Sequence, residues 1–186
     1  SLHSINKLLL RHGLNLFDVA ESPISGGSLV AFFSKEKRVV TGNLKAQLER
    51  EIREGIFSLE AWQDFAKLSF EHREKLKSMI DAENLLGKKV IGYGASARSS
   101  TMLNFCGIDH SHLACVADQN ALKHNRYTPG TDVLIVSPEE ALKEKPDTVV
   151  ILAWNFKDEI IEDLKEKGFK GSVIIPLPST PYLLEI

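Results

Sequence analysis

The hydrophobic positions follow two different patterns along this chain of 186 residues, and the change between them divides it. Up to about residue 86, apolar residues recur mainly at helical spacing, interrupted by two short stretches at 14–20 and 28–34 that read as strands. From about residue 88 onward, short apolar runs alternate with helical segments, which is typical of a sheet with helical crossovers. The pattern predicts three parts, at residues 1–42, 43–86 and 87–186.

Residues 1–42 are expected to form one helix and one β-hairpin. Leu2, Ile5 and Leu9 recur at helical spacing, Gly13 is a natural helix end, and the two strands flank a loop at 22–27. An isolated two-stranded hairpin is marginal in water, so this segment needs a larger sheet to join. The sequence begins within this pattern, and we expect that the chain was cut from something longer.

Residues 43–86 are predicted to be a helical connector. A first helix ends near Gly55, and Ser58 is placed to cap a second helix of about 25 residues. An apolar stripe follows this second helix, and packing against a neighbouring domain explains it better than a cofactor contact does. The stripe consists of Trp62, Phe65, Ala66, Ser69, Phe70, Leu76, Met79 and Ile80.

Residues 87–186 predict an α/β fold. Five strands are expected, near 90–91, 113–118, 132–136, 148–154 and 172–177, and Pro176 suits an edge strand. Right-handed crossovers then give a Rossmann-like, doubly wound five-stranded parallel sheet in the order 3-2-1-4-5.

The turn after the first of these strands is the leading candidate for a binding site. Gly92, Gly94 and Ala97 fit the spacing G-x-G-x-x-G/A, in which the glycines allow a tight turn and close approach of a phosphate. The third, small position lets helix and strand pack closely. The N–H groups of Ala95, Ser96 and their neighbours, the helix dipole and Arg98 would then face an anion. A purely structural turn is the alternative.

Three other places add candidate residues. Asp118 ends the second strand, where dinucleotide folds place a carboxylate that binds a ribose hydroxyl, although a turn aspartate would look the same. The long polar loop 119–131 supplies Lys123, Arg126 and Tyr127, which suit a flat, anionic ligand such as a nucleotide. At the end of the fourth strand, Trp154 and Asn155 would project from the carboxyl edge of the sheet unless Trp154 belongs to the core.

Composition excludes several classes of function. A formal charge of −2 and the lack of a basic block argue against nucleic-acid binding, and no apolar run reaches the roughly 20 residues that cross a bilayer. The sequence lacks a signal peptide, and Cys106 and Cys115 have apolar neighbours and no metal-ligand spacing, which indicates reduced core thiols in a cytoplasmic protein. The residues suggest no catalytic nucleophile, P-loop lysine or metal site.

Four motifs resemble those of one family, the S-adenosylmethionine-dependent C-methyltransferases of nucleotide-linked keto-deoxysugars. They are Gly92-Tyr-Gly-Ala-Ser-Ala, Asn104-Phe-Cys-Gly-Ile, Asn125-Arg-Tyr-Thr-Pro-Gly-Thr and Leu152-Ala-Trp-Asn-Phe. The resemblance implies that 1–42 are the last helix and hairpin of a methyltransferase domain. It also implies that 87–186 form a carboxy-terminal domain that helps to bind the nucleotide sugar.

By the same resemblance, S-adenosylmethionine and zinc are expected only in the full-length parent, upstream of Ser1, and this fragment alone should be inactive. The family hairpin often carries His-Gly-Gly, where this chain has Ser25-Gly26-Gly27, so no role is carried over from that histidine. The ligand expected for the fragment is a nucleotide sugar of the dTDP type. Its base, its sugar and the methylated carbon stay open.

Two other classes of function stay open. Gly92, Gly94, Ala97 and Asp118 would also suit an NAD(P)-type dinucleotide module, although a second mononucleotide-binding half is missing. The apolar stripe would suit a non-catalytic assembly domain. In either case, an unpaired hairpin predicts a homodimer formed through residues 1–42.

Overall fold

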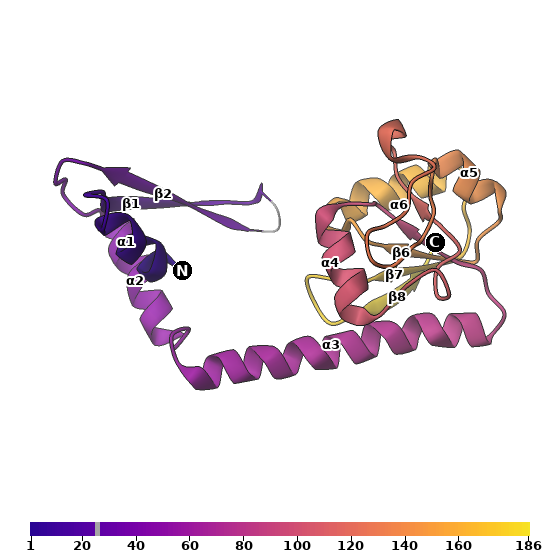
Figure 1. The fold of residues 1–186 in the computed structure, drawn as a ribbon, viewed down its shortest axis with the longest axis horizontal. Coiled ribbons are helices and arrows are strands. Elements are labelled where there is room, and N and C mark those ends of the chain that lie inside the picture. The colour runs from indigo at the N-terminus through magenta and orange to yellow at the C-terminus, as the bar shows by residue number, and fades with distance from the viewer. Residues whose placement is uncertain (25–26) are drawn as a thin grey trace. The chain divides into compact units, whose positions relative to one another are not determined.

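The computed structural model describes residues 1–24 and 27–186, and the chain divides into two compact units. The first, here called the N-terminal unit, comprises Ser1–Leu68, and the second, the sheet unit, comprises Ser69–Ile186. The long helix α3, Leu59–Leu85, contributes residues to both (Figure 1). Each unit is described by itself.

The N-terminal unit contains the expected helix and hairpin. Helix α1, Leu2–Leu10, precedes the antiparallel strands β1, Asn15–Ser22, and β2, Ser28–Ser34, and helix α2, Gly42–Arg53, follows them. Buried Glu51 of α2 accepts hydrogen bonds from the N–H groups of Leu2 and His3, at 2.7 and 3.2 Å. This carboxylate satisfies two backbone donors that every helix leaves unpaired at its start, and it ties α1 to α2.

The predicted cap of α3 is present. Ser58 Oγ accepts a hydrogen bond from the N–H of Ala61 at 3.1 Å. The apolar stripe of α3, however, divides into two parts: Leu76 and Ile80 are fully buried, whereas Trp62 and Phe65 are about 60% exposed (61% and 62%). The packing expected for the whole stripe is therefore present only in its carboxy-terminal half.

The sheet unit is α/β and contains a largely parallel sheet. Its strand order is β5-β4-β3-β6-β7-β8, in which the first five are parallel and follow the order expected from right-handed crossovers. The strands are β3 (Val90–Tyr93), β4 (Val116–Ala117), β5 (Ile135–Val136), β6 (Thr148–Ile151), β7 (Ser172–Ile175) and β8 (Tyr182–Glu185).

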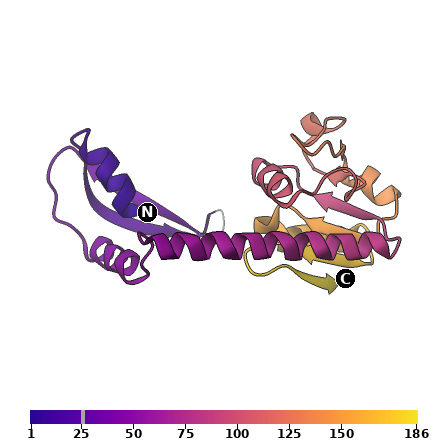
Figure 2. The same ribbon diagram turned by 60° about the horizontal axis from the view of Figure 1, so that its bottom comes forward.

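The expectation of five strands is corrected to six. Strand β8 pairs antiparallel with β7 and is the last strand of the sheet, at the yellow end of the ribbon in Figure 2. Pro176 is therefore not on an edge strand; it directly follows β7, where the ladder has ended and its missing N–H costs nothing. Strand β8 is short and mostly exposed, and the sequence analysis did not assign its apolar residues Tyr182, Leu183 and Leu184 to a strand.

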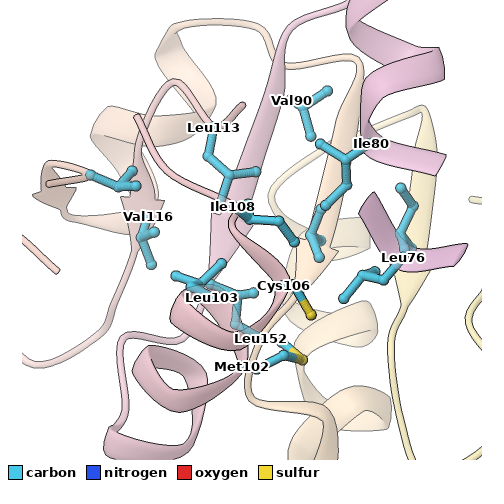
Figure 3. Close-up of a cluster of buried hydrophobic side chains, with 13 residues drawn as sticks. Leu76, Ile80, Val90, Met102, Leu103, Cys106, Ile108, Leu113, Val116 and Leu152 are labelled. Atoms are coloured by element: carbon cyan, nitrogen blue, oxygen red, sulfur yellow. The ribbon is translucent and has the colours of Figure 1, made fainter. Parts of the chain in front are cut away.

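Helices cover both faces of this sheet. One core contains Leu76 and Ile80 of α3 together with Leu103 of α4 (Ala97–Cys106), packed against Val90 and Val150 (Figure 3). On the opposite face, α5 (Pro138–Lys143) and α6 (Lys157–Glu166) pack on residues such as Ile91, Val149 and Val173. Successive residues of β3 alternate between these two cores, as the pleat of a strand requires.

Three of the strands expected from the sequence are shorter in the structure. Strands β4 and β5 have two residues each, much shorter than the apolar runs at 113–118 and 132–136. The fourth strand ends at Ile151, and Trp154–Phe156 form the short 3-10 helix η3.

Among the described residues, no helix combines the length and apolar character needed to span a membrane.

Candidate functional site

The glycine turn connects β3 to α4, as the sequence predicts, but close packing explains its glycines. Gly94 has φ +99°, and a Cβ placed there would lie 2.4 Å from the Cβ of Ala153, which follows β6. A Cβ at Gly92 would lie 2.7 Å from Leu152 Cδ1. Gly94 therefore needs glycine before any ligand is considered, whereas a side chain at Gly92 would require Leu152 and Val116 to move.

Most N–H groups of this turn are already hydrogen-bonded within the protein. The N–H of Gly94 donates to the carbonyl of Ala117 at 2.7 Å, and that of Ala95 donates to Asp118 Oδ2 at 2.8 Å. Ser96 and Ser99 form a reciprocal capping box, with N–H to Oγ distances of 2.6 and 3.1 Å. The N–H groups of residues 94–96 therefore donate within the protein, which leaves their expected role toward an anion a prediction without support from free donors.

Ala97 and Arg98 keep the character of an anion site. Within the part of the chain that the structure describes, their N–H groups have no acceptor, and both side chains are exposed in the first turn of α4. Ala97 does not mediate close packing of helix on strand, because it faces solvent. Ser99, 1% exposed, is the residue that faces inward there.

Asp118 forms a bridge between two loops. Its Oδ1 accepts from the N–H of Asn120 at 2.8 Å, while Oδ2 accepts from the N–H of Ala95 and from Lys123 Nζ, at 2.8 and 2.9 Å. Lys123 Nζ also donates to the carbonyl of Ala95 at 2.7 Å. The buried carboxylate thus holds the glycine turn in place, which favours its structural role over ribose binding.

The loop 119–131 is ordered by contacts with α4. Asn104 Nδ2 donates to the carbonyl of Pro129 at 2.9 Å, and a Cβ on Gly130, at φ +75°, would lie 2.5 Å from Asn104 Oδ1. Two of the four motifs therefore meet in one structural contact. Arg126 and Tyr127 lie on the exposed side of this loop.

In the segment after β6, the ring of Trp154 packs against the core and the ring of Phe156 is exposed. Trp154 is partly buried against the core of α3 and α4, which supports its assignment to the core. Asn155 is exposed, and Phe156 has 55% of its surface exposed.

A cavity of about 320 Å³ lies where β3, β4 and β6 end. Strands β3 and β6 are neighbours although the chain has passed through β4 and β5 between them, so this is the point at which the strand order reverses. Ligands of open α/β sheets bind at such a point, outside the carboxyl ends of the strands. The lining residues are Tyr93, Gly94, Ser96, Asp118, Gln119, Lys123, Ala153, Phe156, Glu159 and Ile160.

This cavity includes four of the twelve candidate residues, namely Gly94, Ser96, Asp118 and Lys123. The sequence analysis missed Glu159 and Ile160, because an acid and an apolar residue in the first turns of a helix are ordinary there. Phe156 could have been identified as a candidate from the sequence, since it is the last residue of one of the four motifs. The binding roles of all twelve residues stay predictions.

Burial shifts the pKa of three groups in the sheet unit, of which Tyr93 lines the cavity. Burial raises the pKa of the Tyr93 hydroxyl, which donates to Asp163 Oδ2 at 2.8 Å, so that Tyr93 stays protonated. Burial also raises the pKa of both Cys106 and Cys115 to about 11. Among the described residues, no group of three His, Cys, Asp or Glu side chains is placed to hold a metal ion.

The fold and this cavity define an α/β domain with a crevice of the kind that takes small molecules. Residues 23–178 match the family model described as "C-methyltransferase C-terminal domain". The chain is also 33% identical over 181 residues to "C-methyltransferase NovU" of Streptomyces niveus, which covers 96% of this chain and 43% of that protein.

The chain therefore belongs to the C-methyltransferase C-terminal domain family, and it spans less than half the length of that relative. This bears out the family suggested by the four motifs. The family hairpin often has His-Gly-Gly where this chain has Ser25-Gly26-Gly27. Residues 25 and 26 of this segment lie outside the described residues.

Proposed function

We propose that this chain is the substrate-binding portion of a sugar C-methyltransferase and that its sheet unit binds a nucleotide-linked keto-deoxysugar of the dTDP type. The observation that carries the proposal is the cavity at the reversal of strand order, beside a helix start with two N–H groups that lack an acceptor among the described residues. In this proposal the sheet unit is a Rossmann-like domain, with helices on both faces of its sheet, and its role is to bind the ligand.

Within this proposal, the diphosphate lies against the N–H groups of Ala97 and Arg98 and the guanidinium of Arg98. A charged donor strengthens such a contact, and the position at the start of a helix adds the favourable end of its dipole. Arg126, Tyr127 and Asn155 are exposed and remain candidates for contacts with the rest of the ligand.

The dinucleotide alternative is weaker. It needs a carboxylate that is free to bind a ribose, whereas both oxygens of Asp118 already accept hydrogen bonds. An assembly role is the second candidate, because Trp62 and Phe65 present exposed rings on α3. The two roles are compatible in one protein.

Calorimetric titration separates these functions. We expect the chain to bind a dTDP-linked deoxysugar more tightly than dTDP and to give no heat with NAD. It should also show no affinity for S-adenosylmethionine, whose site we place elsewhere in the parent protein, together with zinc and the methyl-transfer chemistry. Tight binding of NAD, or micromolar binding of S-adenosylmethionine, would contradict the proposal.

A further inference from the structure

We propose that the 320 Å³ cavity takes an uncharged ring bearing hydroxyl groups and excludes the diphosphate of the same ligand. The ring belongs either to the nucleoside or to the deoxysugar, which share this chemistry. The inference rests on the proposed function and divides its ligand between two places, the cavity and the start of α4.

The charges that line the cavity oppose an anion. The lining contains one cation, Lys123, and two carboxylates, Asp118 and Glu159. Lys123 is already paired with Asp118 at 2.9 Å. Glu159 forms no hydrogen bond or ion pair within residues 1–24 and 27–186; only its electrostatic interaction with Lys157, whose main partner is Asp158, offsets its charge where a diphosphate would have to lie.

Four N–H groups at the cavity already donate within the protein, whereas that of Gln119 has no acceptor among the described residues. The N–H groups of Gly94, Ala95 and Ser96 all donate within the protein, and the N–H of Ala153 donates to the carbonyl of Tyr93 at 3.2 Å. Phosphate sites on glycine turns depend on N–H groups that are free to point at the ligand. The N–H groups of Ala97 and Arg98 meet this condition, and neither residue lines the cavity.

The same lining suits a neutral ring. The exposed face of Phe156 offers a stacking surface next to the buried side chain of Ile160. Glu159 can accept hydrogen bonds from hydroxyl or imide groups, and Gln119 can both donate and accept. A volume of about 320 Å³ is at the small end for ligand pockets, so it fits one part of a nucleotide sugar and not the whole.

NMR titration of the whole chain tests this inference, with thymidine, L-rhamnose and sodium pyrophosphate as separate probes. We expect at least one neutral probe to shift the amides of Gly94, Ala153 and Phe156, and pyrophosphate to leave them unchanged. A response to thymidine alone assigns the cavity to the nucleoside, and a response to L-rhamnose alone assigns it to the sugar. Both results support the proposal.

Variants of two lining residues give the size of the effect. Phe156→Ala should weaken the neutral probe by about 5- to 150-fold, since stacking of a base on an aromatic ring has that magnitude. Glu159→Gln should weaken it by about fivefold, because a charge-assisted hydrogen bond becomes a neutral one. The matched control is Glu162→Gln, on the same helix but outside the lining, and it should bind like the parent.

The proposal is overturned if pyrophosphate shifts the cavity amides and Glu159→Gln strengthens that response, or if neither neutral probe reaches the cavity. Its failure is distinguishable from failure of the proposed function. If a dTDP-linked sugar binds the parent and Phe156→Ala equally well, the cavity assignment is wrong and the function stands. If a neutral probe binds in the cavity but the nucleotide-linked sugar binds no more tightly, the function is wrong and the cavity assignment stands.

Discussion

The two units of this chain differ in how much of their apolar surface they bury themselves. The sheet unit has two cores, one on each face of its sheet, and both contain fully buried side chains from strands and helices. Among its described residues, the N-terminal unit has one small core of four buried residues, namely Leu2, Leu16, Val19 and Leu44. A small core contributes little net stability, because the conformational entropy that the chain loses on folding offsets most of the stabilisation from apolar burial.

The exposed apolar side chains of the N-terminal unit complete this contrast. Trp62 and Phe65 on α3 are mostly exposed, and β2 presents Leu29, Val30 and Phe32, each more than 40% exposed. Both strands of a two-stranded sheet also have an open edge. The sheet unit therefore has the features of a self-sufficient domain, whereas the N-terminal unit has those of a part that another surface covers.

The largest expected effect comes from emptying the core of the sheet unit. Ile80→Ala removes a fully buried side chain and should lower the free energy of unfolding by about 2–5 kcal/mol. Ile52→Ala, at a side chain that is 70% exposed in the N-terminal unit, should change it by less than about 0.5 kcal/mol. Each unit contains one of the two tryptophans, so the fluorescence of Trp154 in a Trp62→Phe background reports urea unfolding of the sheet unit for Ile80→Ala, and that of Trp62 in a Trp154→Phe background reports the N-terminal unit for Ile52→Ala. Equal losses in the two variants would remove the contrast.

The glycine turn gives the next largest effect. Gly94→Ala combines a left-handed φ with a clash against Ala153, and should cost about 2–5 kcal/mol. Gly107→Ala is the matched control, because its φ is +63° but nothing lies within 4 Å of the added Cβ. It should cost only about 1–2 kcal/mol. Thermal unfolding of both variants tests this, and equal melting temperatures would show that the approach to Ala153 is unimportant.

The third prediction concerns the contribution of the Arg98 side chain to ligand binding by the sheet unit. Arg98→Ala should leave the melting temperature nearly unchanged, since the residue is exposed, and should weaken binding of a dTDP-linked sugar about 10- to 100-fold. Lys165→Ala, in the last turn of α6, removes an exposed cation remote from the proposed diphosphate position and serves as control. Undiminished affinity in Arg98→Ala would mean that the diphosphate binds elsewhere.

The open edges of the N-terminal unit should make the chain associate with itself. We expect a mass that rises with concentration in sedimentation equilibrium, through residues 1–42, and we expect Val30→Lys to reduce it, because a charge on an exposed strand discourages pairing. A monomer at every concentration, with residues 1–42 well ordered by hydrogen exchange, would argue against this association.

The smallest effect concerns the two thiols of the sheet unit. Both are buried, with pKa values raised to about 11, so a disulfide reagent at pH 8 should label neither until the protein is unfolded. Because their folded pKa values lie above the unfolded value of about 8.5, stability should be undiminished below that pH and should fall as the pH rises above it. Fast labelling of the folded chain would indicate an opening of this core.

Much of the sheet unit could be predicted from its sequence, because its apolar runs, glycine turn and caps all indicate the same fold. The sequence Ser137-Pro138 is a typical helix start, and it opens α5, with Glu140 completing a capping box. Strand β8 was missed because its run of three apolar residues, Tyr182, Leu183 and Leu184, is too short to indicate a strand by itself. The runs at 113–118 and 132–136 are longer than β4 and β5, although backbone hydrogen bonds of Ala114, Cys115, Asp118 and Leu134 to the neighbouring strands continue just beyond the two-residue strands.

The site was harder to predict than the fold for a physical reason. A glycine turn has the same sequence whether its N–H groups face a ligand or are used internally, and here the hydrogen bonds to Ala117, Asp118 and Ser99 decide it. Similarly, Glu159 is ordinary in sequence and becomes notable only because the fold places it, without a hydrogen bond or ion pair among the described residues, at the cavity.

The central claim is that the sheet unit binds a nucleotide-linked sugar at the carboxyl ends of its strands. The most direct test is to map the amide shifts of the isotope-labelled chain as a dTDP-linked deoxysugar is added. The account predicts shifts at residues 92–98, 118–123 and 153–159, and none at residues 1–42. Saturable shifts confined to the N-terminal unit, or at the opposite ends of the strands, would contradict it.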